Sequence, residues 1–352
     1  MKKINYIYKI TGQILFVIIF LSTSPVKSLD KFSNAERISN YFSGILLLND
    51  DQYEDSHRFL KKLNGLESSH VDYSIKYLYS LVNSGNLKEA FNYSQKIEKK
   101  KLDSFESLLI SGIFYLKNSN ISLAQKYFFK AMNRNSRFVL NNFVSNSLYN
   151  WSNLSNLQKA TSDLNNLDER FENLKKIQNI FLNCYFESSN TSDIFLNVIS
   201  DSKTDFSRYN YFYASYVAST GDIDSAKEIV NTALELYPRN LLLNQYKINL
   251  RESNNISIFD CKQKKHVIAE ILYITSNALA SQSLYSLSNF YLNMAKYLNE
   301  DFYSYDTLLA ENYYKVNNFE KAKKIYYYLR NKGEAFNWYA SKQLARIFIQ
   351  NK

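Results

Sequence analysis

The sequence predicts an all-α fold that is built from repeated pairs of helices. The stretch 107–136 holds two successive runs in which small and apolar residues recur at the i, i+3, i+4 and i+7 positions of one helix face. The polar residues 117–120 separate the two runs and indicate a turn between two helices. Landmarks of this stretch recur about every 34 residues along the chain, and no alternating pattern typical of β-strands competes with them.

The two runs combine small and large side chains at fixed offsets. They consist of Leu108, Ser111, Gly112 and Tyr115, and then of Leu123, Ala124, Tyr127, Phe128 and Ala131. Small residues such as Gly112 and Ala124 stand where two packed helices would touch, and a bulky residue such as Phe128 would fill the space beside them. The pattern resembles the tetratricopeptide repeat (TPR), a helix–turn–helix unit of about 34 residues.

The recurrence is regular at the start of the chain and looser in its middle. Two series of landmarks lie 34 residues apart, namely Ser56, Ala90 and Ala124, and Gly44, Leu78 and Gly112. Gly85 and Gly221 fall on the turn between two helices, where a residue that is free to adopt positive φ is favoured. Pro238 falls where the repeat ends its second helix, which a proline cannot continue.

The resemblance implies an α-solenoid of about seven to eight stacked TPR units plus a C-terminal capping helix. Clear units are expected near 35–136, an irregular stretch at 137–206, a clear unit at 207–240, a break at 251–265, clear units again at 266–332 and the cap at 335–349. Because each unit packs on the next, residues 29–352 are expected to form one elongated domain.

The N-terminus has the layout of a secretory signal peptide over residues 1–28. Lys2 and Lys3 supply positive charge, the run 14–21 (ILFVIIFL) is apolar, and the residues Val26 and Ser28 suit a cleavage point. A membrane span needs about 20 apolar residues, so we expect no stable span after cleavage, with an uncleaved anchor as the alternative. The rest of the chain is expected to be periplasmic or otherwise exported. It is similar to exported TPR proteins of proteobacteria.

Cys184 and Cys261 are the two cysteines of the chain. They lie 77 residues apart, in different repeats. In a solenoid each repeat touches only its neighbours, whereas a disulfide requires Cα atoms within about 7 Å. The sequence therefore predicts two buried thiols and no disulfide.

The net charge is +10, with 43 Lys and Arg against 33 Asp and Glu. A basic surface can bind nucleic acid, an anionic membrane or an acidic protein. Here the positive charge is scattered, and the abundance of Lys, Asn, Ile and Tyr is typical of an A+T-rich genome. Basic runs such as 96–101 (KIEKKK) are interpreted as solvated helix faces. We therefore expect no nucleic-acid partner.

The sequence contains no recognisable catalytic constellation. The histidines are His57, His70 and His266, and none stands at metal-ligand spacing with a further set of ligands. A glycine-rich phosphate loop, a nucleophile elbow and a paired-cysteine zinc pattern are all missing from the sequence. We expect neither enzymatic activity nor a cofactor or metal.

In TPR proteins the first helix of each unit lines a concave groove that holds a peptide. Carried over to this chain, the resemblance places in the groove Ile75, Tyr79, Leu109, Ile113, Lys117, Tyr211, Ser215, Glu311 and Tyr314. Such an apolar, tyrosine-bearing groove suits a peptide or helix with hydrophobic side chains. The expected function is a non-enzymatic protein–protein interaction scaffold in the bacterial cell envelope. The alternatives are a self-associating structural protein and an accessory platform for an envelope enzyme.

Overall fold

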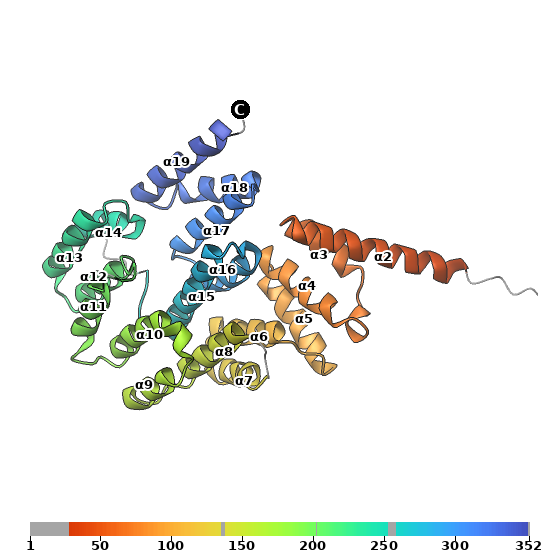
Figure 1. Ribbon diagram of the computed structural model, residues 1–352, viewed down its shortest axis with the longest axis horizontal. Coiled ribbons are helices and arrows are strands. Elements are labelled where there is room, and N and C mark those ends of the chain that lie inside the picture. Colours follow the sequence, from red (N-terminus) through yellow and green to blue (C-terminus); the bar gives the residue numbers. More distant parts are fainter. Residues whose placement is uncertain (1–27, 135–137, 202, 253–257, 351–352) are drawn as a thin grey trace, which may run out of the picture. The chain divides into compact units, whose positions relative to one another are not determined.

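The computed structural model describes residues 28–134, 138–201, 203–252 and 258–350 (Figure 1). This part of the chain contains eighteen α-helices, α2 to α19, the 3₁₀ helices η1 (Leu66–Ser68) and η2 (Glu169–Phe171), and no strand. Among the described helices, none has the length and apolar character needed to cross a membrane. The predicted signal peptide lies outside the described residues except for Ser28, the first residue of α2. The predicted all-α fold of stacked helical pairs is confirmed.

The chain divides into two compact units, of which the first ends at Leu66. The described part of this unit is one helical pair, α2 (Ser28–Asn49) and α3 (Tyr53–Lys61). Gly44 in α2 faces α3, because a Cβ at this position would lie 2.7 Å from the Leu60 side chain. The Ser56 hydroxyl donates a hydrogen bond of 2.8 Å to the Gly44 carbonyl. The interpretation of Gly44 as a close helix contact is thus confirmed.

The second unit, Glu67–Lys352, holds the other sixteen described helices. Fourteen of them form consecutive pairs: α4 (Val71–Asn83) with α5 (Leu87–Lys99), α6 (Phe105–Lys117) with α7 (Ile121–Met132), α8 (Val139–Ser152) with α9 (Leu157–Asn165), α10 (Glu172–Tyr185) with α11 (Thr191–Ile199), α12 (Tyr209–Ser219) with α13 (Ile223–Leu236), α15 (Lys264–Ser281) with α16 (Tyr285–Leu298), and α17 (Ser304–Lys315) with α18 (Phe319–Leu329). The other two helices, α14 (Leu241–Arg251) and α19 (Glu334–Gln350), pack on each other.

The turns inside the pairs repeat one backbone conformation. The residue with positive φ is, in chain order, Asp51, Gly85, Ser119, Glu187, Gly221, Ser283 and Asn317. Most of these positions follow each other at 34 residues, as Gly85 follows Asp51 and Ser119 follows Gly85. The α8–α9 turn differs, because Asn153 has a φ of −110°. The 34-residue period is therefore present in the backbone, including turns where the sequence has no glycine.

Asparagine and aspartate side chains begin many of these helices. Asn120, Asn156, Asp222, Asn240 and Asn318 each accept a hydrogen bond from the backbone N–H three residues further on. Such a bond satisfies one of the four N–H groups that have no partner within the helix. Four asparagines and one aspartate thus stabilise helix starts. The Asn-rich stretch 137–206 still forms the pairs α8–α9 and α10–α11.

The pair α15–α16 lies against helices that are distant in the sequence (Figure 1). α16 packs on α4 and α6, and α15 packs on α8 and α10. These four are the first helices of their pairs and form the inner face that was predicted to hold a peptide. The Asn83 amide in α4 donates a hydrogen bond to the Ser286 carbonyl in α16, 203 residues away in sequence. The second unit is therefore a solenoid whose inner face holds some of its own later helices.

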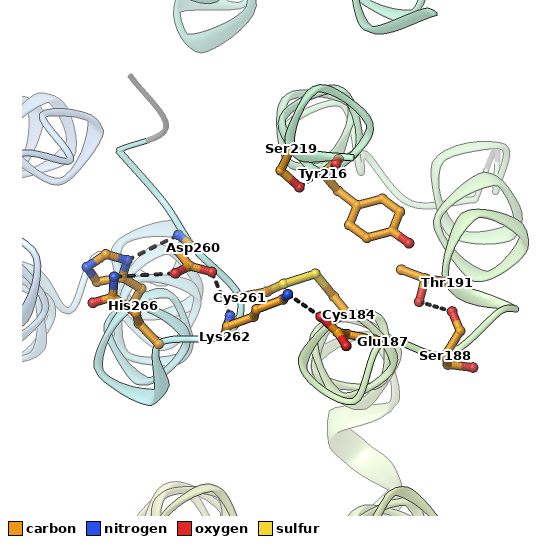
Figure 2. The surroundings of a disulfide bond; sticks show 11 residues. Cys184, Glu187, Ser188, Thr191, Tyr216, Ser219, Asp260, Cys261, Lys262 and His266 are labelled. Atoms are coloured by element: carbon orange, nitrogen blue, oxygen red, sulfur yellow. Dashed lines mark hydrogen bonds and ion pairs between the residues drawn. A yellow bond between two sulfur atoms is a disulfide. The ribbon is translucent and has the colours of Figure 1, made fainter. Parts of the chain in front are cut away.

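This packing shows that the prediction of two free thiols was wrong. Cys184 near the end of α10 and Cys261 before α15 form a disulfide, with Cα atoms 6.0 Å apart (Figure 2). The prediction assumed that each repeat touches only its sequence neighbours. Because α15 instead returns to α10, the two cysteines meet although they lie in different pairs.

Candidate functional site

The predicted groove residues of α4 and α6 lie on the two helices on which α16 packs. They are Ile75, Tyr79, Leu109, Ile113 and Lys117. Tyr79 stacks on Phe290 of α16 with ring centroids 4.4 Å apart, and Lys117 forms an ion pair of 2.7 Å with Glu300. Leu109 and Ile113 are fully buried, while Ile75 is partly exposed. The chain itself therefore occupies much of this part of the inner face.

The remaining predicted groove residues are separated from these. Tyr211 is buried in an aromatic cluster, Glu311 accepts a hydrogen bond from Tyr339 in α19, and Tyr314 packs on the second helix of its own pair. The nine predicted residues therefore do not form one continuous groove in the structure. Of the nine, Ser215 lines an open pocket.

A buried ion pair holds α15 against α12. Arg208, which precedes α12, donates two hydrogen bonds to the Glu270 carboxylate over 2.7 and 2.8 Å and one of 3.0 Å to the Ser304 hydroxyl. Its guanidinium also lies 3.9 Å from the centroid of the Tyr273 ring. Burial raises the pKa of Glu270, and the positive charge of Arg208 opposes that rise. The cluster therefore fixes α12, α15 and the start of α17 relative to one another.

An open pocket of 510 Å³ lies beside the disulfide, between α10, α12 and the segment that precedes α15. We call it the disulfide pocket. The aromatic rings of Phe181, Phe195, Phe212 and Phe259 line it, and all four residues are buried. Its volume falls in the range of about 300 to 1,000 Å³ that is typical of ligand sites, which are mostly apolar with a few polar groups. The disulfide pocket can therefore accept an apolar group of moderate size.

The rim of the disulfide pocket is polar and carries opposite charges (Figure 2). Lys262 donates a hydrogen bond to Glu187, and this bond holds the pKa of the Glu187 carboxyl below its ordinary value. The hydroxyls of Ser219 and Thr220 donate to backbone carbonyls of α12 over 2.6 and 2.8 Å. Asp260 also lines the pocket, so its charged lining groups are two carboxylates and one ammonium, and the rim disfavours a negatively charged ligand group.

A half-buried histidine fixes the segment that carries Cys261. The Asp260 N–H donates a hydrogen bond of 3.1 Å to His266 Nδ1. Burial lowers the pKa of His266 to about 4, so the ring is neutral at pH 7 and its Nδ1 can accept this bond. The segment 260–262, which lines the disulfide pocket, is therefore held by the disulfide and by the hydrogen bond to the His266 imidazole.

Sequence reasoning identified Ser215 but missed the phenylalanines around it. The two signals that bear on this site were the cysteine pair and the loss of the repeat period at 251–265. Each was noted separately, and neither placed α15 beside α10. Among the residues that the structure describes, no three His, Cys, Asp or Glu side chains are placed to share a metal ion.

No family model matches the chain, and no curated protein matches it significantly. Solved structures do match. A Naa15/Naa10 complex bound to HypK-THB matches with 14% identity and a TM-score of 0.24, over 90% of this chain and 66% of that chain. A human IFIT1 dimer with m7Gppp-AAAA matches with 16% identity and a TM-score of 0.27, over 84% and 69% of the two chains. The chain spans about two thirds of these solved chains, and TM-scores this low support no inference about its function.

Proposed function

We propose that the protein is a non-enzymatic binding scaffold of the TPR type that acts in the bacterial cell envelope. Its partner is another protein, which inserts an apolar side chain into the disulfide pocket. The observation that carries this proposal is the pocket itself. It is an opening lined by four phenylalanines, beside helices whose other inner surfaces pack against the chain's own helices.

The chemistry of the disulfide pocket supports a protein partner and a binding role. A phenylalanine or leucine side chain of the partner would bury its own apolar area in the disulfide pocket, at about 25 cal/mol per Å². The hydroxyl and backbone groups at the rim suit the main chain on either side of that side chain. Glu187 and Lys262 at the rim are engaged with each other, and the Asp260 carboxylate accepts hydrogen bonds from the Lys262 N–H and the Gln263 side-chain amide. These pairings favour recognition over proton transfer.

The disulfide supports the proposed location outside the cytoplasm. Disulfides persist in oxidising compartments such as the bacterial periplasm and are rare in the cytosol. The bond between Cys184 and Cys261 agrees with the signal-peptide pattern of residues 1–28. These two observations are independent, because one rests on the fold and the other on the leader sequence.

The proposal is tested by photocrosslinking from the pocket rim. Ser219 is exposed at the end of α12 and lines the disulfide pocket, so a photoreactive residue at this position would contact a bound partner. The matched control places the same residue at Thr232, which is exposed on α13 and does not line the pocket. Crosslinking is carried out in envelope preparations, and the products are identified by mass spectrometry.

We expect a defined protein product from position 219 and none from position 232. The substitution Thr220→Trp, which fills the pocket mouth from an exposed position, should abolish that product while leaving the circular dichroism spectrum unchanged. Identical products from both positions, or a product that persists with Thr220→Trp, would contradict the proposed site.

A further inference from the structure

The last helix of the chain completes a pair with a helix from its middle. α14 follows the α12–α13 pair and packs on α13, and α19 packs both on α18 and on α14. The Ala335 N–H at the start of α19 donates a hydrogen bond of 3.1 Å to Gln245 Oε1 in α14. Gly333 allows this approach, because a Cβ there would overlap the Gln245 side chain. The junction is thus fixed by specific contacts.

An apolar groove of 390 Å³ runs along this junction. We call it the C-terminal groove. Its walls include Leu241 and Ile248 of α14 and Trp338 of α19, and the Trp338 side chain is 67% exposed. Exposed aromatic residues of this size are enriched among the residues that dominate binding energy at protein interfaces. The apolar surface continues along α19, because Ile349 lies on the same helical face, eleven residues after Trp338, and is 73% exposed.

The charges around the C-terminal groove are mostly positive. Arg239 lines it, and Lys342 Nζ lies 5.2 Å from the centroid of the Trp338 ring. Further exposed cations on the same two helices are Lys247, Arg251 and Arg346. In the described part of the chain none of these five cations forms an ion pair, whereas Glu334 is the acidic residue of the groove lining. Two further carboxylates lie nearby, because Glu252 follows Arg251 and Glu311 accepts a hydrogen bond from Tyr339 of the groove lining. With five cations against three carboxylates, the groove offers apolar contacts in a surrounding of net positive charge.

We propose that the C-terminal groove docks an acidic amphipathic helix of a partner protein. Its apolar stripe would lie over Leu241, Ile248 and Trp338, and its Asp and Glu residues would face Arg239 and Lys342. A helix laid into an apolar groove contacts it through residues at i, i+3, i+4 and i+7, and complementary charge fixes its orientation and speeds its association. This site lies on α14 and α19 and does not depend on the disulfide pocket.

The proposal is tested with two synthetic helical peptides and the full chain. Each has about 16 residues, to match the 17 residues of α19, and carries Leu and Phe on one face. One peptide has Asp and Glu at its other positions and the second has Lys and Arg, and neither contains Trp. Binding is followed by the fluorescence of Trp338. The second tryptophan, Trp151, is 1% exposed and serves as a constant background, and the Trp338→Phe variant is the optical blank.

We expect the acidic peptide to shift the Trp338 emission to shorter wavelength and to bind about tenfold or more tightly than the basic peptide, with a preference that falls as salt is raised. The double variant Arg239→Glu/Lys342→Glu should reverse this preference. The control Lys99→Glu/Lys126→Glu makes the same charge change on exposed positions of α5 and α7 and should preserve it. Thr220→Phe, which obstructs the mouth of the disulfide pocket without adding a tryptophan, should leave peptide binding unchanged, and this result would separate the C-terminal groove from the disulfide pocket.

Three outcomes would overturn the proposal. The first is equal binding of both peptides, or no change in Trp338 emission with either. The second is a dimer of the protein alone, seen by light scattering, that Trp338→Ala dissociates, because the groove would then hold a second copy of the chain. The third is binding of anionic phosphatidylglycerol vesicles, lost in Arg239→Glu/Lys342→Glu, without binding of the acidic peptide.

Discussion

Removing the carboxylate of Glu270 while leaving Arg208 in place should strongly destabilise the second unit. The Glu270 side chain is fully buried and that of Arg208 is 17% exposed, and two hydrogen bonds of 2.7 and 2.8 Å join them. Truncating one partner of a buried pair leaves the other charge without compensation and costs about 3 to 5 kcal/mol. Since whole domains are stable by only about 5 to 15 kcal/mol, we expect Glu270→Ala to remove a large share of the free energy of unfolding.

The assay is urea unfolding followed by circular dichroism at constant pH, with the disulfide intact. The matched control is Asp163→Ala, which breaks the exposed pair between Lys159 and Asp163 at 3.2 Å and should cost about 0.5 kcal/mol or less. The double variant Arg208→Met/Glu270→Met removes both charges and should recover much of the loss. If Glu270→Ala costs no more than Asp163→Ala, the inference that this cluster fixes α12 against α15 is refuted.

Three further predictions concern the disulfide, the turns and the half-buried His266. Replacing Cys184 and Cys261 by serine should lower the free energy of unfolding by about 4.5 kcal/mol, the value for opening a 77-residue loop; an unchanged urea midpoint would contradict it. Ser119→Gly should stabilise the protein by roughly 0.5 to 1 kcal/mol and Gly85→Ser should destabilise it by a similar amount, because both positions have positive φ; thermal shifts of the same sign would disprove this. The pKa of His266 is lowered to about 4, so its contribution to stability is complete above the unfolded value of about 6.5 and is lost as pH falls toward 4; His266→Gln should remove this part of the pH dependence of unfolding.

The local architecture could be predicted from the sequence because it depends on nearby residues. Gly112 stands where a Cβ would overlap the Phe128 ring, and Gly85 and Gly221 have φ of +80° and +96° in the turns. α13 ends at Leu236, two residues before Pro238. Spacing within one repeat determines such contacts, so a regular pattern of small and large residues is enough to infer them.

The long-range packing could not be predicted from that pattern. The 34-residue period does not indicate that Phe290 stacks on Tyr79 or that Glu270 pairs with Arg208. Each of these residues would also fit a repeat that contacts only its sequence neighbours. The assumption of neighbour-only contacts then excluded the disulfide. Buried charges within α15, such as Glu270, were the available signal, since a carboxylate on a buried helix face requires a partner.

The packing of α16 on α4 and α6 has a consequence for the folding of the newly synthesised chain. Synthesis produces Tyr79 and Asn83 long before their partners Phe290 and Ser286. The surface of α4 that packs on α16 therefore remains exposed to solvent until the later segment has left the ribosome. Helical hairpins can form early, because their contacts are local. The contacts between α4 and α16 form later, because contacts between residues far apart in the sequence slow folding. A truncated chain that ends before residue 264 should therefore be prone to aggregation and sensitive to proteases, although it contains most of the helical hairpins.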